Sequence, residues 1–168
     1  GRMGLWIQAM AGQALSRNTP MVVANDIYCV SGTGTSELLW EIAAGAAIGA
    51  VCGLHQHGSG VRGGATLDQT TGLEARFQAQ VAHAALGITR EEVNGYVLEF
   101  LSHYEGSLDN PNTGKSFPEL YDEDTLEIKD EWLEPYYKVC DAISQLGLDV
   151  NNAWRKVLYS RGQPVYTH

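Results

Sequence analysis

Three polar side chains follow one short apolar run and could bind or protonate a small ligand. Asn25, Asp26 and Tyr28 come directly after Met21–Ala24, which is apolar throughout and bounded by turn signals. An amide, a carboxylate and a phenol at the end of a strand can orient a small polar molecule or move a proton. Asn and Asp also form turns by bonding their own backbone, so a loop-forming role for these residues remains an alternative.

Two imidazoles follow a second apolar run in the same way. His55 and His57 come after Ala50–Leu54, and their spacing puts both rings on one side of an extended backbone. Such a pair suits acid–base work, contact with a substrate or partner, or a metal ion. Asp26 and Glu41 are the candidates for a further metal ligand. Substrate contact, a metal site and a structural role therefore stay open.

Two other features favour structural roles. The glycine-rich segment Ser31–Thr35 lacks the third glycine of a dinucleotide fingerprint and the lysine of a P-loop, so we predict a tight turn that caps a helix. Cys29, Cys52 and Cys140 are an odd number without CxxC spacing, which argues against a disulfide framework and fits a reducing cytoplasm. We expect each cysteine to be a small buried apolar residue.

Strands and helices must position these residues. Apolar side chains recurring about every 3.6 residues predict helices. The runs Met21–Ala24 and Ala50–Leu54 lack polar alternation, which is typical of strands buried on both faces of a parallel sheet. The order of elements indicates a parallel α/β fold, in which both polar segments lie at the carboxyl edge of the sheet. The expected helices span residues 4–17, 36–48, 70–86, 89–104 and 130–146, and we expect the first of them to be buried.

Charge is distributed unevenly along the chain. The 168 residues include 11 Lys and Arg and 20 Asp and Glu, a net charge of −9 that argues against a nucleic-acid partner. No apolar stretch reaches the roughly 18 residues of a membrane span. Residues 1–60 contain five of these charged side chains, so this part needs cover from other polypeptide. We expect either the C-terminal part of a longer protein or a homo-oligomer.

One segment carries a family resemblance. Leu67–Arg76, with the sequence LDQTTGLEAR, closely resembles the TDKTTGMEAR stretch of the archaeal monomethylamine:corrinoid methyltransferases. The resemblance covers about residues 2–149 and is most specific from residue 66 onward. Further matches are Glu91–Asn94, Leu101–Glu105 and Gly114–Phe117.

The resemblance implies a fold and an activity. The chain would be the C-terminal part of a TIM (β/α)8 barrel. Residues 1–88 would hold the last two parallel strands with their helices, and residues 89–150 a C-terminal helical extension. Residues 151–168, with Trp154 and Tyr159, would form a tail beyond the family's usual end. The implied cytoplasmic enzyme transfers a methyl group from monomethylamine to the cobalt of a cognate corrinoid protein and releases ammonia.

The resemblance also implies roles for particular residues. Tyr28 matches a family tyrosine and Asp26 replaces a family glutamine after the seventh strand, so we predict that both are catalytic. We predict that Asn25, His55 and His57 bind substrate at the barrel mouth, where the corrinoid enters. The corrinoid is carried by the partner, and no cofactor binds this chain directly. Pyrrolysine, the family's electrophile, is implied to lie outside these residues, so the chain alone is expected to be inactive.

Two alternative functions stay open. The first is a metal-dependent hydrolase or lyase on the same barrel, using His55, His57 and Asp26, which stoichiometric metal in the purified protein would favour. The second is a catalytically inactive fragment that only associates with other chains. A test of whether the chain binds a corrinoid protein distinguishes this inactive fragment from the methyltransferase.

Overall fold

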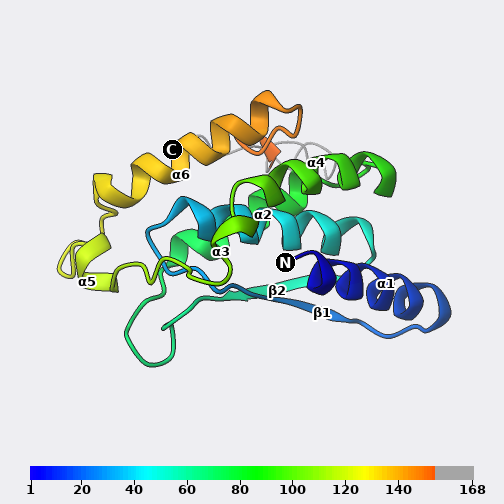
Figure 1. Cartoon of the computed structure of the whole chain (residues 1–168), viewed down its shortest axis with the longest axis horizontal. Helices are drawn as coiled ribbons and strands as arrows, with labels where there is room; N and C mark the ends of the chain where they lie inside the picture. Colours follow the sequence, from blue (N-terminus) through cyan, green and yellow to red (C-terminus); the bar gives the residue numbers. More distant parts are fainter. Residues whose placement is uncertain (154–168) are drawn as a thin grey trace.

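A two-stranded parallel sheet lies along one side of the molecule, and helices cover one of its faces (Figure 1). The computed structural model describes residues 1–153, so the predicted tail with Trp154 and Tyr159 lies outside the described residues. The strands are β1 (Ala24–Tyr28) and β2 (His55–Gly60). The helices are α1 (Arg2–Asn18), α2 (Ser36–Val51), α3 (Gly72–Ala84), α4 (Arg90–Ser102), the 3-10 turn η1 (Glu105–Ser107), α5 (Phe117–Leu120) and α6 (Asp130–Gln145).

Both strands begin later than the apolar runs indicate. The strands predicted at Met21–Ala24 and Ala50–Leu54 are wrong in position, and the polar residues expected after the strands form the strands themselves. Alanine keeps α2 helical as far as Val51. The helix ends at Val51, and Gly53, two residues later, has a positive φ of 82° that allows the Leu54 N–H to donate to the Gly49 carbonyl at 2.9 Å.

The two strands pair in parallel, which confirms the predicted arrangement. Asn25 lies opposite Gln56, but Asp26 lies opposite Gly58. His57 is therefore an extra residue on β2, and the sheet contains a β-bulge beside Asp26.

The α2 helix is the centre of the core. All its residues from Leu38 to Gly49 are buried, between the sheet on one side and α3, α4 and α6 on the others. Glycines let it approach β1 closely: a Cβ at Gly45 would lie 2.8 Å from the Ile27 side chain, and one at Gly49 would lie 2.2 Å from Nδ2 of Asn25. The predicted helix over residues 36–48 is thus confirmed, and the three cysteines are buried and free as predicted.

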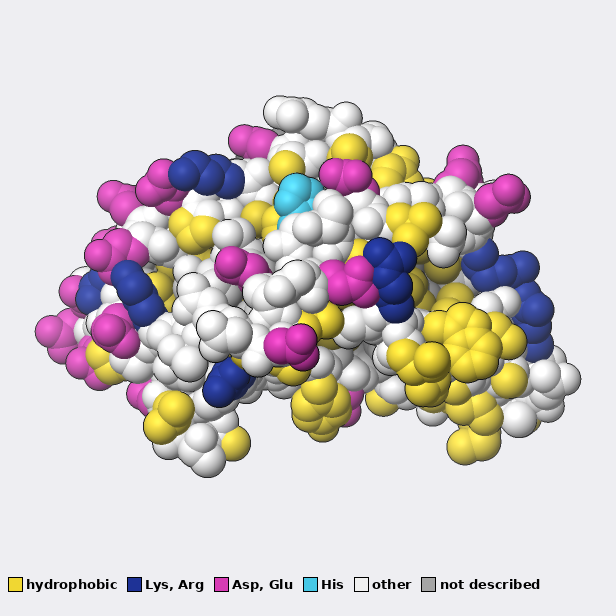
Figure 2. All heavy atoms as spheres, viewed as in Figure 1, with side chains coloured by type: hydrophobic (Ala, Val, Ile, Leu, Met, Phe, Trp, Pro, Cys, Tyr) yellow, Lys and Arg dark blue, Asp and Glu magenta, His cyan; other side chains and the backbone are white. Residues whose placement is uncertain are grey.

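The α1 helix departs from the expectation of a buried helix. On one side, Gln8 donates to the Gly45 carbonyl at 2.9 Å, but Gly12 is its only buried residue. Figure 2 shows apolar side chains gathered over α1, where Trp6 is 61% exposed and Met3 is 68% exposed. These exposed side chains agree with the expectation that residues 1–60 need cover from other polypeptide. Within residues 1–153, no helix has both the length and the apolar character required to cross a bilayer.

Candidate functional site

Four of the five predicted site residues share the face of the sheet that no helix of residues 1–153 covers. Asp26 and Tyr28 on β1 and His55 and His57 on β2 are all exposed. Their position follows from the alternation of β1, in which Asn25 and Ile27 point toward α2 while their neighbours point away. We call this surface, with Asp26, Tyr28, His55 and His57, the open face.

Asp26 and His57 are joined on the open face. Nδ1 of His57 lies 2.6 Å from Oδ1 of Asp26, a hydrogen bond that becomes an ion pair when the imidazole is protonated. The bulge brings the two side chains together. His57 has no residue directly opposite it on β1, and it therefore lies next to Asp26. The second carboxylate oxygen of Asp26 and Nε2 of His57 make no hydrogen bond within residues 1–153. Both atoms are thus available to a ligand.

The Tyr28 ring lies against the backbone of β2. A Cβ added to Gly60 would approach its Cδ1 to 2.8 Å, so the absence of a side chain at Gly60 makes room for the ring. Tyr28 is 81% exposed, and its hydroxyl bonds no other group in the described part of the chain. The hydroxyl can therefore donate to, or accept from, a molecule on the open face.

Asn25 lies on the opposite face, which corrects its predicted grouping with the other four residues. It is 3% exposed, and its Nδ2 donates to Oε1 of Gln56 at 3.1 Å. Its Oδ1 accepts a hydrogen bond from Gln8 at 2.5 Å. Because side chains alternate along β1, Asn25 and Asp26 cannot face the same ligand directly. Asn25 instead links β1 to α1 and β2.

The loop between β1 and α2 is held from both ends. The Glu41 carboxylate accepts the backbone N–H groups of Val30 and Ser31, each at 3.0 Å, so both of its oxygens are already engaged by the loop. Thr35 caps α2 by accepting from the Leu38 N–H, which confirms the predicted turn and helix cap. Within residues 1–153, no three His, Cys, Asp or Glu side chains form a group that could hold a metal ion.

The segment Leu67–Arg76, which carries the family resemblance, connects several elements through hydrogen bonds. Its sequence alone did not reveal this structural role. The Thr71 hydroxyl donates to the Glu74 carboxylate and accepts a hydrogen bond from Nε1 of Trp132 at 3.1 Å. The carbonyl of Asp68 accepts the Phe117 N–H at 2.7 Å. This segment, which we call the anchor segment, therefore ties the loop after β2 to α5 and α6.

The buried carboxyl of Glu74 makes the stability of the protein depend on pH. Burial raises the pKa of Glu74 above its ordinary 4.5, and the hydrogen bond from Thr71 opposes this shift. The folded protein thus keeps this proton at pH values where the unfolded chain has lost it. The stabilisation that protonated Glu74 contributes is complete below about pH 4.5 and is lost as the pH rises through the folded pKa.

We expect the Glu74→Gln substitution to remove this pH dependence. Relative to the variant, the free energy of unfolding of the wild type should fall as the pH rises above 4.5. Urea denaturation at a series of pH values measures the difference. Glu92→Gln is the matched control. Hydrogen bonds from Thr89 lower the pKa of that exposed carboxyl, so the free energy of unfolding of the wild type relative to this variant should change with pH in the opposite direction. Parallel pH profiles for wild type and Glu74→Gln would contradict the prediction.

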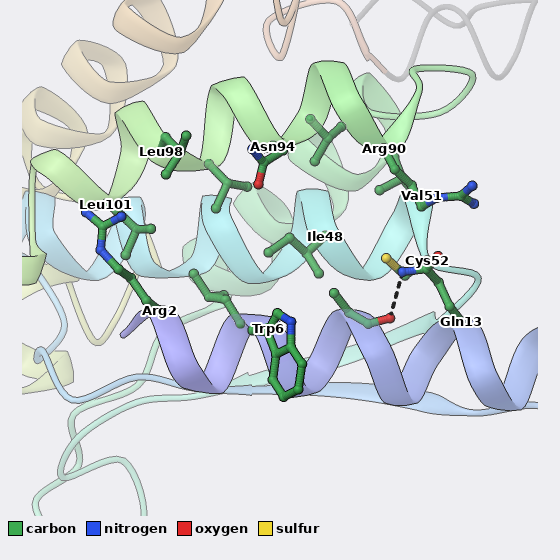
Figure 3. Close-up of a pocket in the computed structure, with 14 residues that line it drawn as sticks. Arg2, Trp6, Gln13, Ile48, Val51, Cys52, Arg90, Asn94, Leu98 and Leu101 are labelled. Atoms are coloured by element: carbon green, nitrogen blue, oxygen red, sulfur yellow. Dashed lines mark hydrogen bonds between the residues drawn. The ribbon is translucent and has the colours of Figure 1, made fainter.

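Two hollows lie near these elements. One, of about 310 Å³, is a largely apolar groove between α1, α2 and α4, and its lining includes Trp6, Ile48 and Leu98 (Figure 3). The other, also about 310 Å³, borders β1 and includes Asp26 and Tyr28 in its lining. The second hollow therefore extends the candidate site beyond the edge of β1.

Comparison with known proteins relates this arrangement to one enzyme family. The profile described as "Monomethylamine methyltransferase MtmB" matches residues 1–148. MtmB2 of Methanosarcina acetivorans and MtmB1 of Methanosarcina barkeri are each 32% identical to the chain over 149 residues, which are 88% of this chain and 32% of each relative.

Solved structures agree with the sequence comparison. The crystal structure of the Methanosarcina barkeri monomethylamine methyltransferase (MtmB) superposes with a TM-score of 0.77 and 31% identity. The match covers 84% of this chain and 31% of that one, and the structure of a hydroxylamine complex of MtmB gives the same values. The chain thus spans about a third of the length of the relatives it matches.

Proposed function

We propose that this chain, which belongs to the monomethylamine methyltransferase MtmB family, contributes the open face to an active site that demethylates monomethylamine. The methyl group goes to the cobalt of a corrinoid protein, and ammonia is released. The observation that carries the proposal is the family match over 88% of the chain, within which Asp26 and Tyr28 lie on the uncovered face of the sheet.

The two strands are proposed to be the last two of a TIM barrel. In such a barrel, helices cover the outer face of every parallel strand, while the inner face points into the packed barrel interior, and the active site lies at the C-terminal ends of the strands. The β1–β2 pair has this asymmetry, because α2 and α3 cover one face and the other is open. The open face would then point into the barrel interior, and further parallel strands would pair with the free edges of β1 and β2.

The side chains of the open face suit a small cationic amine. The Asp26 carboxylate attracts an ammonium group, and the Tyr28 hydroxyl can orient the same nitrogen. His55 and His57 complete the polar surface from β2. Asn25 supports this surface from behind through its bonds to Gln8 and Gln56. The electrophile that binds the amine is supplied by polypeptide outside these residues.

The cobalt is proposed to come with the partner. A corrinoid supplies a cobalt(I) nucleophile that takes up the methyl group when the corrinoid protein docks at the barrel mouth. This chain's own task is to hold the amine and its adduct in line with the approaching cobalt, which lowers the entropic part of the barrier. No observation on the described residues favours the alternative of a metal-dependent hydrolase or lyase.

A methyl-transfer assay tests the proposed function. The protein that contains this chain, together with the polypeptide that completes its barrel, is mixed with monomethylamine and a cobalt(I) corrinoid protein. We expect the cobalt(I) absorption to disappear as one ammonia is released for each methylcobalt formed. The 168-residue chain alone should be inactive in the same assay. Absence of methylcobalt from the completed protein would contradict the proposal.

A further inference from the structure

His57 is the one residue of the open face whose orientation is fixed by a carboxylate. Its Nδ1 lies 2.6 Å from Oδ1 of Asp26. An ionised carboxylate only accepts hydrogen bonds, so the Nδ1 atom must carry the proton of this bond. The neutral imidazole then presents an unprotonated Nε2, which is a proton acceptor. His55, on the same face, has no such partner within the described residues.

The space beside this pair can admit a ligand. Gly58 lies opposite Asp26, and a Cβ added there would meet nothing within 4 Å. The bulge that inserts His57 therefore also places a residue without a side chain next to the pair. Bulges often redirect a side chain beside an active site, and here the bulge directs an imidazole toward a carboxylate.

The chemistry of a primary amine requires a proton acceptor. A primary alkylamine, like the lysine side chain with its pKa of about 10.4, is protonated in neutral solution and has no free electron pair on nitrogen. It must lose a proton before it can form a bond to an electrophile. A neutral imidazole held within hydrogen-bonding distance of the ammonium group can take this proton.

We propose that His57 is the proton acceptor for the substrate ammonium group and that Asp26 positions it. This inference rests on the proposed function. The ammonium N–H bond breaks and a bond from that proton to Nε2 forms, which leaves a neutral amine and an imidazolium. The positive charge thereby moves from the substrate to His57, where the Asp26 carboxylate stabilises it, as in other carboxylate–imidazole pairs.

The tautomer of His57 tests the geometry without an activity assay. Nitrogen NMR under alkaline conditions distinguishes the two tautomers of the neutral imidazole. We expect the Nδ1–H form for His57 in the wild type and a shift toward the Nε2–H form in Asp26→Ala. A His57 that carries its proton on Nε2 in the wild type would overturn the proposal.

Chemical rescue tests the role in catalysis in the completed protein. We expect His57→Ala to lower methyl transfer about 100-fold. Imidazole added to the buffer should restore part of this activity, which it could not do for a merely structural histidine. The rescue should weaken when Asp26→Ala is added to His57→Ala. The control His83→Ala removes a histidine of α3 that lies outside the site and should retain wild-type activity.

The outcomes separate the two proposals. A wild-type protein that forms no methylcobalt contradicts the proposed function, whatever tautomer His57 adopts. An active wild type in which His57→Ala has full activity, or loses activity without rescue by imidazole, contradicts the assignment of His57 alone.

Discussion

Replacing Gly32 by alanine should lower the free energy of unfolding by about 3 kcal/mol. A Cβ at this position would lie 2.0 Å from the Thr113 carbonyl oxygen and 2.6 Å from the Gly114 nitrogen, and backbone atoms cannot rotate away as a side chain could. The Gly32 N–H also donates to the Asn112 carbonyl, with 2.8 Å between N and O. If the two loops moved apart to make room for the new Cβ, this hydrogen bond would lengthen. Urea denaturation measures the loss.

Gly95→Ala is the matched control for this substitution. Gly95 lies exposed within α4, and a Cβ there would meet nothing within 4 Å. Alanine should therefore stabilise the helix by about 0.5–1 kcal/mol, the opposite sign. A Gly32→Ala protein as stable as the wild type would show that the loop before α2 does not depend on close packing against residues 112–114.

Replacing Trp132 by alanine should cost about 3–5 kcal/mol of stability. Trp132 on α6 is fully buried, and its Nε1 donates to the Thr71 hydroxyl of the anchor segment. The substitution removes a large apolar side chain and one hydrogen bond together. Trp132→Phe separates the two effects, because it retains an aromatic ring and loses the donor.

We expect Trp132→Phe to cost about 1–2 kcal/mol, well below the cost of Trp132→Ala. Chemical denaturation of both variants under the same conditions makes the comparison. Equal losses for the two variants would mean that the bond to Thr71, rather than packing, holds α6 against the anchor segment.

The five long helices could be predicted from the sequence because their apolar periodicity and caps are local, whereas the short η1 and α5 were not predicted. Thr89 and Glu92, for example, form a capping box at the start of α4. The strands could not be placed in this way. β2 consists of His, Gln, Ser and Gly, and its backbone is extended because β1 pairs with it and Gln56 bonds Asn25 and Gln78. Tertiary pairing therefore overrides the weak local preference of these residues.

The candidate site was predictable as a set of residue types but not as a geometry. Tyr28, Asp26 and both histidines lie on the open face as a group, whereas Asn25 turns away because β1 begins at Ala24. The hydrogen bond between His57 and Asp26 depends on a register change that neither strand's own sequence encodes. Their roles in binding and catalysis stay predictions.

The close approach of α2 to β1 has a consequence for how such a protein can diversify. Gly45 and Gly49 fix the separation of helix and strand, so a larger residue at either position would disturb the core. Asp26, Tyr28, His55 and His57 touch no part of that contact, because they project from the other side of the sheet. Mutations that change ligand preference can therefore accumulate there with little effect on folding, and new specificities can evolve on an unchanged scaffold.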